Sequence, residues 1–141
     1  MSDTYDLERF ASAQADVYET ALSELRAGQK RSHWMWYVFP QLQGLGRSPT
    51  ARAFALRSLG EAKAYLEHPL LGPRLRTCTR AVLAHKNRSA QAIFGYPDVL
   101  KFRSCMTLFT QLEEVPFSEA LAVHYGGEPD ERTLELLSEQ P

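Results

Sequence analysis

Residues 30–48 read KRSHWMWYVFPQLQGLGRS and contain both tryptophans of the chain. The run from Trp34 to Phe39 is continuously apolar, so periodicity alone cannot assign it to a helix or a strand. It is short, a proline follows it, and no partner strands are evident elsewhere. We therefore predict a short buried helix ended by Pro40, then a glycine-containing turn, then a new helix capped by Ser48.

Helix signals continue on both sides of this stretch. Apolar residues recur at helical spacing over 17–25, 71–82 and 99–112. Ser58 and Ser89 have the character of helix caps, Pro97 opens a large helix, Pro116 breaks it, and Asp130 starts the last one. The patterns predict an all-α fold, a compact orthogonal bundle of about seven or eight helices without a sheet. No repeat or linker divides the chain, so residues 1–141 are expected to form a single domain.

Length and composition narrow the protein class. A chain of 141 residues with 44% hydrophobic residues is long enough to bury a core. It has no run of the ~18 apolar residues typical of a membrane span, and its acidic N-terminus lacks a signal sequence, so we expect a cytoplasmic protein without a membrane partner. Cys78 and Cys105 are interpreted as reduced core thiols. The scattered histidines predict no metal site, and nothing indicates a cofactor.

The charges are unevenly distributed although their sum is only −1. Residues 25–60 and 68–97 contain no acidic side chain and many basic ones, whereas acidic residues gather near both ends of the chain. In one interpretation, acidic terminal helices pack against the basic middle and neutralise it. In the other, part of the middle stays open and attracts a phosphate or another anion.

Two candidate sites lie within residues 30–48. At the Ser48 helix opening, free backbone amides, flexible glycines and Arg47 are suited to an anion. In the aromatic group, Trp34, Trp36 and Tyr37 could stack on a base, and His33 could act as a general base near neutral pH. The alternative is that these rings only fill the core, since adjacent side chains point in different directions.

A third candidate site is the polar side of the helix that starts near Pro97. Asp98 and Lys101 are spaced to pair on its surface. If this side lines a cleft, Lys101 and Arg103 could hold a phosphate, with Ser104 beside them. Glu61, almost alone in the basic middle, is a candidate catalytic carboxylate. The alternative is a solvated helix face.

Several segments together resemble a known family: 30–41, 44–48, 61–66, 68–72, 94–98 and 101–109. The chain resembles a small bacterial family catalogued as domain of unknown function eighteen-ten, sometimes mislabelled calpastatin. The resemblance covers nearly the whole chain and implies an all-helical cytoplasmic protein without an established activity. A remoter likeness, to a helical superfamily acting on ADP-ribose and related N-glycosides, transfers no catalytic residue.

The leading functional hypothesis is a small enzyme acting on a phosphate-bearing nucleotide or an ADP-ribose-like N-glycoside. In it, Glu61, His33 and Lys101 are the catalytic candidates, with Glu61 stabilising the positive sugar centre or activating water. The ligand-binding candidates are Trp34, Trp36, Tyr37, Arg47, Ser48, Arg103 and Ser104. The alternative is a non-catalytic module whose basic middle, residues 25–97, contacts an acidic protein or, less favoured, a nucleic acid. The affinity of such a contact should fall steeply as the salt concentration rises.

Overall fold

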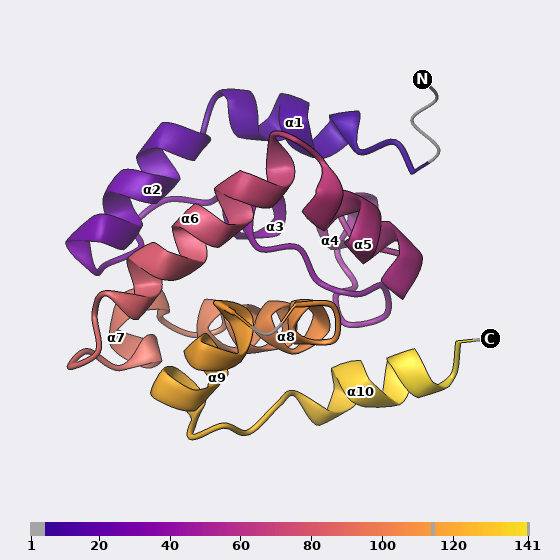
Figure 1. The fold of residues 1–141 in the computed structure, drawn as a ribbon. Coiled ribbons are helices and arrows are strands. Elements are labelled where there is room, and N and C mark those ends of the chain that lie inside the picture. Colours follow the sequence, from indigo (N-terminus) through magenta and orange to yellow (C-terminus); the bar gives the residue numbers. More distant parts are fainter. Residues whose placement is uncertain (1–4, 114, 141) are drawn as a thin grey trace.

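The structure is a computed structural model that describes residues 5–113 and 115–140, and within these ranges the chain forms ten helices (Figure 1). The predicted all-α class is confirmed, although the helices outnumber the seven or eight expected because single-turn segments form helices of their own. The helices are α1 (Glu8–Ala15), α2 (Tyr18–Ala27), α3 (Met35–Val38), α4 (Pro49–Ala53), α5 (Leu59–Glu67), α6 (Leu71–Leu83), α7 (Ala90–Phe94), α8 (Asp98–Thr110), α9 (Phe117–Tyr125) and α10 (Glu131–Ser138).

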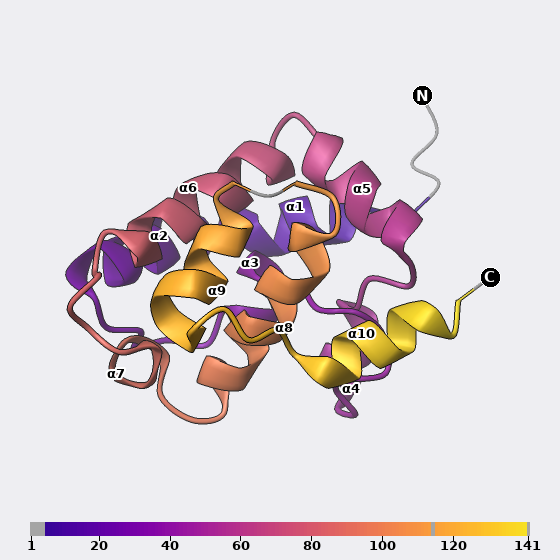
Figure 2. The ribbon, with the colours of Figure 1, turned by 60° about the horizontal axis from the view of Figure 1, so that its bottom comes forward.

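The helices lie in three tiers in the view of Figure 1: α1 and α2 at the top, α5 and α6 across the middle, and α8 to α10 at the bottom. α6 and α8 cross rather than run parallel, and Figure 2 shows α9 and α10 lying against α8. One hydrophobic cluster runs through the tiers and includes the free thiols of Cys78 and Cys105. None of the helices in the described ranges is long and apolar enough to cross a bilayer.

Side-chain caps fix the starts of four helices. The hydroxyl oxygens of Ser48, Ser58 and Ser89 each accept a hydrogen bond from a backbone N–H three residues later, at 3.0 to 3.1 Å. Asp130 does the same at the start of α10. These are the cap positions that the sequence predicts, because a short oxygen-bearing side chain satisfies an amide that has no partner within the helix.

The aromatic run forms the short helix α3, as predicted, but the helix has only four residues and ends at Val38, before Pro40. Beyond it, residues 41–56 are held by two backbone hydrogen bonds, from the Gln43 N–H to the Leu56 carbonyl and from the Leu56 N–H to the Gln41 carbonyl. They produce one isolated bridge and no sheet within the described ranges. These two hydrogen bonds therefore fix the position of the segment after α3, although it does not form a strand.

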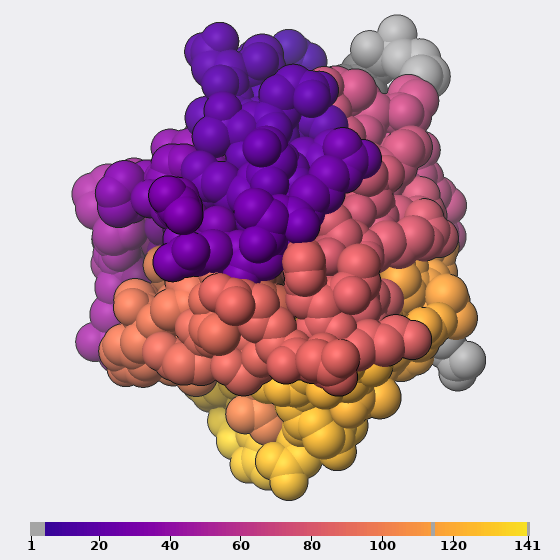
Figure 3. Space-filling model, turned by 90° about the vertical axis from the view of Figure 1, so that its left-hand side faces the viewer, coloured from indigo at the N-terminus to yellow at the C-terminus, as the bar shows by residue number. Residues whose placement is uncertain are grey.

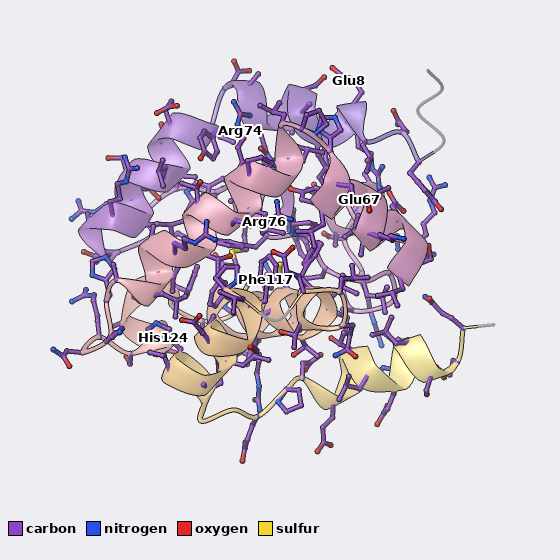
Figure 4. All side chains as sticks on the ribbon, viewed as in Figure 1. Glu8, Glu67, Arg74, Arg76, Phe117 and His124 are labelled. Carbon is purple, nitrogen blue, oxygen red and sulfur yellow. The ribbon has the colours of Figure 1, made fainter. Side chains whose placement is uncertain are left out.

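A buried amide network supports α3 from the upper tiers. Gln14 on α1 is 1% exposed and its amide nitrogen donates to the Tyr37 carbonyl at 2.7 Å and to the Tyr65 hydroxyl at 3.0 Å. Arg74 on α6, which is labelled in Figure 4, reaches over the Tyr18 ring of α2 and donates to the Gln14 carbonyl oxygen at 3.4 Å. α1, α2, α3 and α6 thus share one polar junction.

Glu61 lies in a second polar junction, and this differs from the catalytic position that the sequence suggested. Its side chain is fully buried and accepts hydrogen bonds from Arg9 at 2.9 Å and from the Arg57 N–H at 2.8 Å. Arg9 also donates to the backbone carbonyls of Ala53 and Ala55, at 2.8 and 2.9 Å. The carboxylate therefore joins α1 to the segment between α4 and α5, where burial of an ion pair requires complete pairing.

Replacing Glu61 with Gln should lower the free energy of unfolding by about 3 kcal/mol, because it leaves the Arg9 charge partly buried without its counter-ion. The loss is measured by chemical denaturation. The matched control is Glu67→Gln, an exposed position on the same helix (Figure 4), which should stay within about 0.5 kcal/mol of the parent protein. Unchanged stability of Glu61→Gln would contradict this structural role.

Candidate functional site

The turn that leads into α3 is organised by Glu24 on α2. One of its carboxylate oxygens accepts from the Arg31 N–H at 2.8 Å, the Ser32 N–H at 3.0 Å and the Trp34 indole N–H at 2.9 Å, and the other accepts from the Ser32 hydroxyl. Burial alone would raise the pKa of Glu24, but these hydrogen bonds outweigh it and lower the pKa to about 2. The charged carboxylate thus fixes both the backbone turn and the indole of Trp34.

The aromatic side chains of residues 34–39 divide between the core and the surface. Trp34 is 1% exposed, and Phe39 packs edge-on against Phe102 at 4.9 Å between ring centroids, so both belong to the core. Trp36 and Tyr37 are only partly buried. Neither of the two alternatives, core filling or a pocket, therefore describes the whole run.

A cavity of about 280 Å³ opens where α3 faces the first turn of α8. The side chains around it come from the turn before α3, from α3, from the start of α4 and from α8. Its volume is close to the lower end of small-molecule sites, ~300 Å³. We call it the first cavity; its lining comprises Lys30, His33, Trp34, Met35, Trp36, Tyr37, Ser48, Thr50, Asp98 and Lys101.

Two lysines flank one carboxylate in this cavity. Lys30 is bonded to one oxygen of Asp98 at 2.7 Å and Lys101 to the other at 3.1 Å, which includes the Asp98–Lys101 pairing predicted from spacing. The Lys30 side chain is 7% exposed and also donates to the Ser32 carbonyl at 2.6 Å. Two positive charges against one negative charge leave the group with an excess of one positive charge.

Lys101 also lies over the ring of Trp36, 4.4 Å from its centroid. Gly46 allows the ring to sit there, since a Cβ atom at that position would come within 2.8 Å of the indole and 2.5 Å of the Ala51 side chain. Trp36, Ser48 and Lys101 also line a second cavity of about 370 Å³. The indole is thus a wall shared by two neighbouring cavities.

The structure brings together most of the residues that the sequence proposed for a site. His33, Trp34, Trp36, Tyr37, Ser48 and Lys101 line the first cavity, and Arg47 and Ser104 line the second. Two candidates lie elsewhere. Glu61 is in the Arg9 junction described above, and Arg103 donates to the Glu128 carbonyl at 2.9 Å in a different hollow at the start of α10.

Sequence reasoning passed over three residues that matter here. Lys30 was not among the candidate site residues, yet it is the most buried charge of the first cavity. Glu24 and Gln41 carry no motif. The acid-free stretch was the available signal for Lys30, because a lysine that becomes buried without an acid nearby in sequence needs a partner from elsewhere in the fold.

The family model described as "Protein of unknown function (DUF1810)" matches residues 4–137. The chain belongs to this family. It is also similar to the conserved hypothetical protein Rv1873 from Mycobacterium tuberculosis, with 53% sequence identity and a TM-score of 0.95 over 98% of this chain and 100% of that chain. No curated protein matches the chain. The family resemblance noted from the sequence is confirmed, and since its description assigns no activity, function has to be argued from the site.

Low pH should destabilise the turn before α3. Because the folded-state pKa of Glu24 lies below its ordinary value of 4.5, its stabilisation is complete above pH 4.5 and declines as the pH falls toward 2. Glu24→Gln should lose about 1–2 kcal/mol at pH 7, allowing for solvent screening, and should show a shallower fall in stability below pH 4.5. Urea unfolding across this pH range measures both effects. Glu19→Gln, exposed on the same helix, is the control; parallel curves for Glu24→Gln and the parent would contradict the assignment.

Proposed function

We propose that the protein binds a small phosphate-bearing nucleotide or ADP-ribose-like compound in the first cavity and hydrolyses its N-glycosidic bond. The observation that supports this best is the Lys30–Asp98–Lys101 group beside the partly exposed Trp36 ring. It combines an excess positive charge, a carboxylate and an aromatic surface within one cavity. These are the three elements that a phosphate, a sugar centre and a base would require.

The two ammonium groups are suited to an anionic phosphate. Each lysine has three N–H donors, and Lys101 is bonded to Asp98 through one of them. Lysine acts toward phosphate as a point charge and forms strong charge-assisted hydrogen bonds. Because Lys30 continues to neutralise Asp98, Lys101 can turn toward a ligand without leaving the carboxylate alone.

Asp98 takes the chemical role that the sequence assigned to Glu61. Its side chain is 17% exposed in the cavity, so it can face a bound sugar. As the bond from the anomeric carbon to the base nitrogen breaks, positive charge develops on the sugar, and a nearby carboxylate stabilises it and accepts a proton from the attacking water. His33, exposed on the cavity rim, can donate a proton to the departing base.

A second candidate function draws on the basic surface where the ends of α2 and α6 meet. Figure 3 shows this end of the molecule, with the indigo α2 packed against the salmon α6. Arg26, Arg80 and His85 line a hollow of about 340 Å³ there, and no acidic side chain lines it. An acidic partner held on this surface would dissociate as salt rises, whereas a ligand in the more buried first cavity would lose less affinity.

Lys101→Met should remove most of the preference for AMP over adenosine. Loss of one charge-assisted phosphate contact should weaken AMP binding about tenfold and leave adenosine binding nearly unchanged. The fold should persist because Lys30 still neutralises Asp98. Isothermal titration calorimetry measures both ligands.

Lys63→Met is the matched control, since Lys63 is exposed on α5 and lines neither cavity. It should bind AMP like the parent protein. Equal affinity of the parent for AMP and adenosine would rule out a phosphate site in the first cavity.

Asp98→Asn should separate binding from chemistry. Removal of the negative charge should leave AMP affinity equal or higher, because both lysines then face the phosphate. The rate at which adenine is released from AMP, or nicotinamide from NAD, should fall at least about a hundredfold. Chromatography of the free base measures the rate, and AMP binding by the same preparation shows that the variant is folded. If the parent binds these compounds but releases no base, the protein is a binding module and not a hydrolase.

A further inference from the structure

Three side chains, those of Trp36, Ser48 and Lys101, line both the first and the second cavity. The two cavities therefore adjoin each other, the first with a volume of about 280 Å³ and the second of about 370 Å³. The first is close to the lower end of small-molecule sites in size. A ligand that places a base and a sugar there has room for a further group only beyond Trp36, in the second cavity.

The second cavity carries positive charge without a carboxylate to balance it. Its cations are Arg47 and Lys101, and no acidic side chain of the described ranges lines it. Leu45 and Leu100 form part of its wall and cannot neutralise a charge. A cavity lined by cations and apolar side chains favours a ligand group that is itself negatively charged.

Arg47 is the cation that belongs to the second cavity alone. It is exposed, and its side chain forms no ion pair with any residue in the described part of the chain. An unpaired arginine on a surface is ordinary, but this one lines the same cavity as Lys101. Its planar guanidinium group presents paired N–H donors, a geometry that matches two oxygens of one phosphate.

Two polar side chains lie where the cavities adjoin. Lys101 is bonded to Asp98 through one N–H, which leaves two donors for other acceptors. The Ser48 hydroxyl oxygen accepts from the Ala51 N–H at 3.0 Å, so its own proton remains to be donated. Because Lys101 and Ser48 line both cavities, they can donate to anionic groups on either side of Trp36.

One polar group of the second cavity takes no part in this site. The amide nitrogen of Gln41 is buried without a hydrogen-bond partner among residues 5–113 and 115–140. Because that nitrogen is closed to solvent, we assign it no contact with a ligand. The chemistry of the second cavity is therefore set by its two cations.

We infer that the ligand carries two linked phosphates, the first bound by Lys101 where the cavities adjoin and the second bound by Arg47 in the second cavity. This rests on the proposed function, because the base and sugar of the same molecule occupy the first cavity beside Asp98. The substrate class is then a nucleoside diphosphate or a compound built on one. Arg47 is the residue that distinguishes this class from nucleoside monophosphates.

Three adenine nucleotides test the inference on the parent protein. ADP has two linked phosphates, AMP has one, and adenosine 3′,5′-bisphosphate has two that are attached at separate positions of the sugar. We expect ADP to bind about tenfold more tightly than AMP, the effect of one added charge-assisted contact. The bisphosphate should bind like AMP, because its second phosphate does not extend past Trp36. Calorimetry at fixed ionic strength, without divalent cations, measures all three.

Arg47→Met should bind ADP only as tightly as AMP, because it removes the contact to the second phosphate, and its affinity for AMP should change less than about twofold. Arg52→Met is the matched control, since Arg52 is exposed on α4, is also without an ion pair in the described ranges and lines neither cavity. It removes the same charge from the same region and should keep the tenfold preference for ADP.

The outcomes distinguish the inference from the proposed function. If AMP binds in a manner sensitive to Lys101→Met but ADP binds no more tightly, the diphosphate inference is wrong and the phosphate site of the first cavity stands. A preference for ADP that survives Arg47→Met, or an equal gain for the separated bisphosphate, would also overturn the inference. If none of the nucleotides binds at millimolar concentration, the proposed function fails and the inference fails with it.

Discussion

The buried ammonium group of Lys30 connects the parts of this structure that matter for function. It joins the turn before α3 to the first residue of α8 through the 2.7 Å bond to Asp98, and it also donates to the Ser32 carbonyl. A charge that is only 7% exposed is tolerated where its donors are matched by acceptors. Lys101 adds a second positive charge to the same carboxylate, which already has a counter-ion in Lys30. The fold requires one of these lysines to neutralise Asp98, and the other remains available for an anion.

The helices were largely predictable because their signals are local. Ser58, Ser89 and Asp130 cap helices by bonding to an amide three residues away, a relation that can be inferred from the sequence alone. The length of α3 was harder to predict from the sequence. Its four residues depend on Gln14 of α1 and Glu24 of α2, which bond to it or to the turn before it from earlier helices.

The sequence indicated part of the candidate site, and the two candidates that lie outside the cavities do so for one physical reason. The aromatic run and the start of α8 both line the first cavity, and the sequence singled out each of them separately. Glu61 lies away from the cavities because its partner Arg9 is 52 positions earlier, and Arg103 because Glu128 is 25 positions later. A charge that looks isolated in the sequence is often paired in the folded protein. A pair separated by so many residues does not appear as a periodic pattern in the sequence. Gln41 was overlooked for a related reason, since nothing in the sequence indicates that a glutamine lacks a partner.

Two departures from ordinary folding rules therefore lie on the two sides of Trp36. The first cavity has a positive charge beyond what Asp98 neutralises, and the amide nitrogen of Gln41, a residue that lines the second cavity, is buried without an acceptor among residues 5–113 and 115–140. Natural sequences satisfy such groups elsewhere in the fold, as Gln14 and the Arg9–Glu61 pair do here. An anionic ligand would meet the first of these needs. Because Gly46 leaves room for the indole and Lys101 lies over its ring, an anion beside Trp36 would meet this need without rearrangement of the core.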